Sequence, residues 1–109
     1  MAPVDGCTLQ FFVPESRRIH GRAAHDWLLE TARGMGIAGG SAFRGIAGYG
    51  RHGVFHEEHF FELAGDLPVQ VLFALTEAEA DRLLARLDQE GVALVYTRQS
   101  ARFGVTGEP

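Results

Sequence analysis

Apolar and polar residues alternate along three stretches of the chain, at the period of two that is typical of strands buried on one side. Apolar residues fall at every second position in residues 7–13, in 67–75 and at the start of 92–98. Pro14 ends the first stretch, and Pro68 belongs at the start or edge of the second, because proline lacks the N–H that a sheet needs. The pattern therefore predicts three β-strands.

Two further stretches have the helical period, with apolar residues three and four positions apart. The first is residues 22–35, and Gly36 favours an end there because glycine often follows the last turn of a helix. The second begins at Thr76, where the Thr-x-x-Glu pattern that includes Glu79 is a capping box. Gly91 ends this helix. The pattern thus predicts two amphipathic helices.

The stretch that follows the first helix is rich in glycine, which makes up six of the sixteen residues 38–53. Its apolar residues predict a second strand over residues 38–49. Glycine weakens a strand, so it usually marks a bulge, a bend or a close approach of another backbone or a ligand. We expect a flexible, cationic loop after this strand, and a short or irregular strand over residues 57–64. Residues 99–109 have no clear pattern.

The predicted order is strand, helix, strand, strand, helix, strand, which is the ferredoxin-like βαββαβ arrangement of the α+β class. Right-handed crossover connections place both helices on one face of a four-stranded antiparallel sheet. The other face then carries exposed apolar residues such as Phe12 and Phe43. A small monomer rarely exposes such a patch, so the fold predicts self-association through that face.

Composition limits the possible partners. The 109 residues, of which 46% are hydrophobic, are enough for a single domain over 1–109. A formal net charge of -4 argues against nucleic-acid binding, and no stretch reaches the ~20 apolar residues of a membrane span, so we expect a soluble protein. Cys7 is the only cysteine, which excludes an internal disulfide and favours a reduced, cytoplasmic protein.

Two motifs resemble a known family. Residues 36–50 read G-I-A-G-x-x-x-x-R-G-I-x-G-x-G, and D-L-P follows at residues 66–68. These motifs are similar to those of the uncharacterised family called domain of unknown function 190, which belongs to the PII-like group. The resemblance covers most of the chain. It implies a ferredoxin-like fold assembled as a homotrimer with the sheets facing inward, and an activity that is poorly defined across the family.

A second resemblance is to the PII signalling proteins themselves. Residues 48–53, G-Y-G-R-H-G, are similar to the PII segment at the base of a long loop, and residues 105–108, V-T-G-E, are similar to part of the PII C-terminal segment. In PII proteins both segments help to line a nucleotide site in the cleft between subunits. This chain departs from PII because it has no lysine and because residues 88–91 are an acidic turn in place of a glycine-rich phosphate-binding loop.

The resemblances and the chemistry together predict a site for a small anionic effector, with ATP, ADP or AMP as candidates. Successive glycine N–H groups can form an anion-binding nest, and arginine donates charge-assisted hydrogen bonds to phosphate or carboxylate. The other interpretation is that Arg44 and Arg98 only pair with acidic neighbours and that the glycines only let the sheet curve. The candidate effector-binding residues are Arg44, Gly48, Tyr49, Gly50, Arg51, His52, Arg98 and Arg102.

Three histidines suggest a different function. His52, His56 and His59 lie within eight residues, beside Glu57 and Glu58, and imidazole with carboxylate is a plausible set of transition-metal ligands. This would make the protein a metal-binding trimer similar to CutA proteins. The simpler interpretation is a loop whose histidines are solvated and titrate near neutral pH.

Enzyme motifs are absent from the sequence, which has no G-x-S-x-G elbow, no P-loop and no HExxH. We therefore expect a non-enzymatic signal-transduction protein of the PII-like group. Its loop after the second strand would control a partner protein, such as a membrane transporter or channel, in response to the effector. The alternatives are the metal-binding trimer and a trimeric scaffold without a ligand. Direct insertion into a membrane is not expected.

Overall fold

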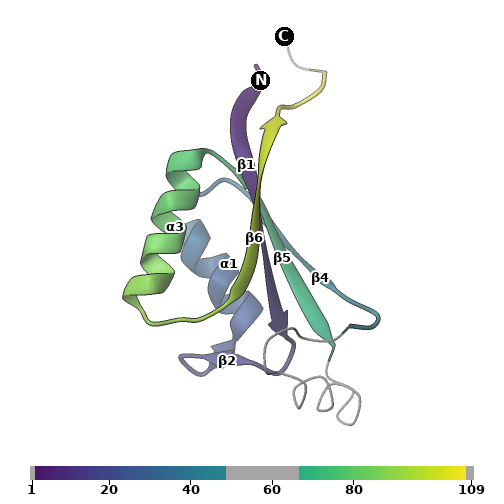
Figure 1. The fold of residues 1–109 in the computed structure, drawn as a ribbon, viewed down its shortest axis with the longest axis vertical. Helices are drawn as coiled ribbons and strands as arrows, with labels where there is room; N and C mark the ends of the chain where they lie inside the picture. Colours follow the sequence, from purple (N-terminus) through teal and green to yellow (C-terminus); the bar gives the residue numbers. More distant parts are fainter. Residues whose placement is uncertain (1, 49–66, 108–109) are drawn as a thin grey trace.

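The computed structural model describes residues 2–48 and 67–107 (Figure 1). The elements are β1 (Val4–Pro14), β2 (Arg18–Ile19), β3 (Arg22–Ala23), α1 (Ala24–Gly34), β4 (Gly40–Arg44), β5 (Pro68–Leu75), α3 (Glu77–Gln89) and β6 (Val95–Phe103). Apart from the short β2–β3 hairpin, the described elements follow the order β-α-β-β-α-β. The predicted ferredoxin-like α+β arrangement is therefore confirmed.

The main sheet is antiparallel and has the strand order β4-β5-β1-β6. Strand β1 lies inside the sheet, between β5 and β6, whereas β4 and β6 form its edges. Both helices lie on the same side of the sheet (Figure 1). Helix α1 contacts β4 and β5, and α3 contacts β1, so the two helices together cover one face.

The core lies between the helices and that face. Every second residue is buried in residues 7–13 of β1 and in residues 69–75 of β5. Phe11 and Phe73 meet edge to face, with their ring centroids 6.0 Å apart. Full burial of one large apolar side chain contributes about 1.5–3 kcal/mol to stability. The prediction that these two alternating stretches are strands buried on one side is confirmed.

Helix α3 has the predicted capping box. The Glu79 N–H donates to Thr76 Oγ1 at 3.1 Å, and the Thr76 N–H donates to Glu79 Oε1 at 2.9 Å. These bonds satisfy two N–H groups that a helix otherwise leaves without partners. The chain turns away at Gly91, where φ is 68°, a value that glycine adopts most easily. Both ends of this helix were therefore predicted correctly.

Helix α1 begins later than expected. It was predicted over residues 22–35 but starts at Ala24, so the predicted start is wrong. Arg22 instead pairs with Ile19 across the β2–β3 hairpin. The turn of this hairpin, His20-Gly21, has φ values of 51° and 78°. Positive φ at both turn residues suits a tight hairpin, but Asn-Gly or Asp-Gly is its usual signal, and His-Gly is a weaker one.

Strand β6 differs most from its prediction. It begins at Val95 and ends at Phe103, so the strand predicted over 92–98 is misplaced, and the stretch 99–109 contains strand where no pattern was evident. Within the described residues, β6 pairs only with β1, which is itself longer than predicted and begins at Val4. An edge strand whose residues are mostly exposed needs no regular apolar alternation, which explains the weak signal.

Strand β4 is shorter than the strand predicted over residues 38–49. It runs from Gly40 to Arg44, after which the chain bends away. Within the strand, glycine allows close packing, because a Cβ at Gly40 would stand 2.5 Å from the Phe73 ring. The irregular strand predicted over residues 57–64 lies outside the described residues.

The face of the sheet opposite the helices carries a row of three apolar residues and one glutamine. Cross-strand pairing places Phe43, Gln70, Phe12 and Val95 directly beside one another across all four strands. Phe43 is 53% exposed, and Phe12 and Val95 are each 39% exposed. The predicted exposure of Phe12 and Phe43 on this face is confirmed.

Candidate functional site

The connection from β4 to β5 is held at its base by close backbone packing. The Gly45 N–H donates to the Pro68 carbonyl at 2.7 Å. An added Cβ would stand 2.9 Å from Pro68 Cγ at Gly45 and 3.0 Å from it at Gly48, so only glycine lets the ring lie where it does. The R-G-I-x-G and D-L-P motifs therefore meet in one contact.

Glu15 joins the end of β1 to this contact. Its N–H donates to the Leu67 carbonyl at 2.9 Å, and its carboxylate accepts a hydrogen bond from Arg44 Nη2. The side chains of Arg44 and Glu15 are 64% and 32% exposed, so this ion pair faces solvent. The loop base, as we use the term, consists of Glu15, Arg44, Gly45, Gly48, Leu67 and Pro68.

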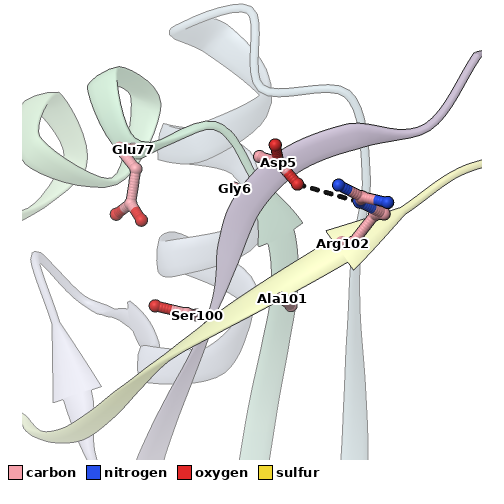
Figure 2. Close-up of a pocket in the computed structure, with 6 residues that line it drawn as sticks. All are labelled: Asp5, Gly6, Glu77, Ser100, Ala101 and Arg102. Atoms are coloured by element: carbon pink, nitrogen blue, oxygen red, sulfur yellow. Dashed lines mark hydrogen bonds and ion pairs between the residues drawn. The ribbon is translucent and has the colours of Figure 1, made fainter.

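A shallow, open groove of about 410 Å³ lies where β1 begins and β6 ends. Arg102 Nε donates to Asp5 Oδ1 at 2.9 Å on one side of it. Figure 2 shows Glu77 projecting from the start of α3 toward Ser100 on β6. This β1–β6 groove is lined by Asp5, Gly6, Glu77, Ser100, Ala101 and Arg102.

Arg98 lies beside this groove and ties β6 to α3. Its Nη2 donates to Glu77 Oε1 at 2.6 Å, and its Nη1 donates to Asp81 Oδ1 at 2.9 Å. The hydrogen bond from Arg98, assisted by one from Cys7, holds the pKa of the Glu77 carboxyl below its ordinary value. The same carboxylates raise the pKa of Arg98. Arg98 therefore stays charged and is already engaged by two acidic partners.

Cys7 is a buried packing residue. Its side chain is fully buried on the helix-facing side of β1. Burial, and then the hydrogen bond to Glu77, raise the pKa of the Cys7 thiol. A neutral, buried thiol is a poor nucleophile, so Cys7 contributes to the packing of the core and not to the groove.

Two of the candidate arginines, Arg44 and Arg102, lie at opposite ends of the sheet. Arg44 pairs across the sheet with Val69, which pairs with Val13, whereas Arg102 pairs with Asp5. Val13 and Asp5 lie eight positions apart on β1, which corresponds to about 26 Å along the strand. One chain therefore does not bring Arg44 and Arg102 to a common site.

Several sequence-predicted residues lie outside the described residues. This holds for the remaining effector candidates and for all three histidines of the metal hypothesis: Tyr49, Gly50, Arg51, His52, His56 and His59. Among residues 2–48 and 67–107, no cluster of three histidine, cysteine or acidic side chains could hold a metal ion. In the same part of the chain, neither helix is long and apolar enough to cross a membrane.

The groove contains residues that the sequence analysis did not select. Asp5 and Ser100 come from segments at the two ends of the chain and meet only because β1 pairs with β6. Glu77 lies within the predicted capping box, between Thr76 and Glu79, and that was the one available signal for it. Arg44 and Arg98 do pair with acidic neighbours, as one interpretation expected, and a role for them in effector binding stays a prediction.

Comparison with known families assigns the chain. The model of the family DUF190, described as "Uncharacterized ACR", matches residues 6–102. This chain belongs to the DUF190 family. A UPF0166 protein of Aquifex aeolicus is 33% identical over 79 residues, which cover 72% of this chain and 75% of that protein. A UPF0166 protein of Methanocaldococcus jannaschii is 29% identical over 79 residues, which cover 72% of each chain.

Solved structures of PII-like proteins share the fold of this DUF190 chain. One is CPII, a nitrogen regulatory PII-like protein from Thiomonas intermedia K12, solved bound to ADP, AMP and bicarbonate. The similarity has a TM-score of 0.60 at 16% sequence identity and covers 94% of this chain and 97% of that one. A second CPII structure gives a TM-score of 0.57 at 16% identity, over 95% of this chain and 100% of that one. The predicted DUF190 membership is confirmed, and the solved structures confirm that the chain has the fold of PII-like proteins.

Proposed function

We propose that this DUF190 protein is a PII-like regulator, not an enzyme, that binds a small anionic effector in clefts between the subunits of a homotrimer. An adenine nucleotide is the leading candidate for the effector. Two findings support this proposal: the family assignment, and a fold shared with a PII-like protein that was solved bound to ADP, AMP and bicarbonate. The regulator would act in the cytoplasm.

The separation of the candidate arginines is the observation that carries the proposal. Arg44 and Arg102 lie about 26 Å apart along the sheet, too far for one phosphate group to contact both within a chain. A cleft between subunits removes this difficulty, because the loop base of one subunit can face the β1–β6 groove of its neighbour. Such a cleft would combine Arg44 and Gly48 with Arg98 and Arg102.

The open face of the sheet supports the trimer. The row of Phe43, Phe12 and Val95 is exposed in the single chain and has the apolar character of the centre of an interface. Burial of these side chains against two further copies would remove them from water. The segment between β4 and β5, with Tyr49, Gly50, Arg51 and His52, would complete the effector site and contact a partner such as a membrane transporter or channel.

The first test is binding of ADP, AMP and ATP by isothermal titration calorimetry, with the subunit number measured by light scattering. We expect a trimer that binds a nucleotide, and we expect Arg102→Gln and Arg51→Ala to weaken that binding at least tenfold. Arg22→Gln is the matched control for Arg102→Gln, because Arg22 forms a similar exposed ion pair with Glu30 on the helical side. A monomer that binds none of the three nucleotides would refute the proposal.

Mixed trimers test whether the site lies between subunits. Arg44→Gln and Arg102→Gln would each reduce binding when alone. The two variants are then refolded together. If each cleft is formed by two chains, random assembly leaves both arginines intact in about a quarter of the clefts. Partial recovery of tight binding is therefore expected. No recovery at all would place both arginines in the site of one chain, or outside the site.

A further inference from the structure

Arg44 has a carboxylate partner in the position that an anionic ligand would occupy. Glu15 accepts a hydrogen bond from Arg44 Nη2, and no other partner of Arg44 is found among the described residues. The Arg44 side chain is 64% exposed, so solvent and small ions can reach it. Its other N–H groups are available, but an incoming anion would meet the charge of Glu15.

Glu15 contributes to the structure of the loop base through its backbone. The Glu15 N–H donates to the Leu67 carbonyl at 2.9 Å, and the Gly45 N–H donates to the Pro68 carbonyl at 2.7 Å. The Pro68 ring packs against the backbone of Gly45 and Gly48. None of these contacts uses the Glu15 carboxylate. The loop base would therefore keep its form if this carboxylate became a neutral amide.

We infer that Glu15 is an internal counter-ion that competes with the anionic effector for Arg44 and so sets the affinity of the site. The inference rests on the proposed function, because it concerns the same effector. A phosphate must either displace the Glu15 carboxylate or bind beside it against like-charge repulsion. Glu15 thus lowers affinity, whereas Arg44 raises it, although the two residues form a single ion pair.

The test compares two substitutions that change the net charge equally. Glu15→Gln removes the carboxylate beside Arg44. Glu30→Gln removes the carboxylate of another solvent-exposed ion pair, in which Glu30 of α1 binds Arg22. Affinities for ADP and for inorganic phosphate are measured by calorimetry at low ionic strength. We expect Glu15→Gln to tighten ADP binding roughly twofold to fivefold, the range typical of one exposed ion pair, and Glu30→Gln to leave it unchanged.

Two further measurements separate competition from a structural role. Added salt should shrink the difference between Glu15→Gln and wild type, because salt screens exposed charges. In the Arg44→Gln background, Glu15→Gln should not change the affinity for ADP, because the guanidinium for which carboxylate and effector compete is absent. A loss of stability alone would produce neither result.

The outcomes distinguish the inference from the proposed function. Equal affinities for Glu15→Gln and Glu30→Gln, in a protein that binds ADP, would overturn the inference and leave the regulator intact. Unchanged ADP binding by Arg44→Gln would also overturn the inference and leave the regulator intact. If wild type binds neither ADP nor phosphate, the proposed function fails and the inference fails with it.

Discussion

The loop base and the β1–β6 groove lie at opposite ends of one sheet and are held by different forces. The loop base depends on backbone hydrogen bonds and on glycines that let Pro68 approach. The groove is lined by exposed ion pairs, such as Asp5 with Arg102. Packing is insensitive to salt and pH, whereas exposed ion pairs weaken as salt rises or as carboxylates become protonated. The comparison suggests that one end fixes geometry and the other supplies adjustable charge.

Gly6 tests the contrast between a packed loop base and a charged groove, because it forms a tight backbone contact within the groove. A Cβ at Gly6 would stand 2.3 Å from the Leu75 carbonyl oxygen and 2.8 Å from Phe103 Cε1. Backbone cannot move aside cheaply, so Gly6→Ala should lower the free energy of unfolding by about 2–3 kcal/mol. Urea denaturation measures this loss.

Gly34→Ala is the control for that experiment. Gly34 lies in the last turn of α1, and an added Cβ there meets nothing within 4 Å. Alanine favours a helix over glycine, so this variant should be as stable as wild type or slightly more stable. An unchanged urea midpoint for Gly6→Ala would show that the groove can relax around a side chain.

Gly45→Ala tests the packing of the loop base and should have a smaller effect. The added Cβ would meet the Pro68 ring at 2.9 Å, and a ring can shift more easily than backbone. We expect a loss of about 1–2 kcal/mol in the free energy of unfolding. Combination with Pro68→Ala removes the clash, so the double variant should lose less than the sum of the single losses. Additive losses would mean that the two residues are not in contact.

The smallest effect concerns pH and the ion pair between Arg98 and Glu77. The pKa of Glu77 is lowered in the folded protein, so its contribution is complete above the ordinary carboxyl pKa and is lost as pH falls through the lowered value. Arg98→Gln should therefore lower the urea midpoint at pH 7, and its effect should be smaller at pH 3, where more of Glu77 is protonated. Arg102→Gln, in the more exposed pair with Asp5, should shift it little at either pH. An effect of Arg98→Gln that is just as large at pH 3 as at pH 7 would argue against the Glu77 carboxylate as its origin.

The elements that form the core could be predicted from the sequence alone. Residues 7–13 and 69–75 alternate because one face of each strand is buried, and burial imposes a period of two on the sequence. The capping box at Thr76 and Glu79 is a local interaction over four residues. The family resemblance was carried by motifs near the loop base, and it predicted the fold and the DUF190 family correctly.

The elements that carry little burial could not be predicted. The β2–β3 hairpin turns at His20-Gly21, where both residues have positive φ, and a turn of this kind leaves no apolar pattern in the sequence. Strand β6 is an edge strand whose end is specified by its register with β1, and that register places Arg102 opposite Asp5. Sequence spacing cannot indicate that these two residues, almost the length of the chain apart, line one groove.

By itself, the sequence determined the two-layer fold, the position of the core, the ends of α3 and the family. Each of these follows from interactions among near neighbours or from burial that repeats with a fixed period. Only the tertiary structure decided that Pro68 packs on Gly45, that Glu15 engages Arg44, and that the groove lies at the opposite end of the sheet. These contacts join distant segments through strand register and close packing, which no local pattern of residues encodes.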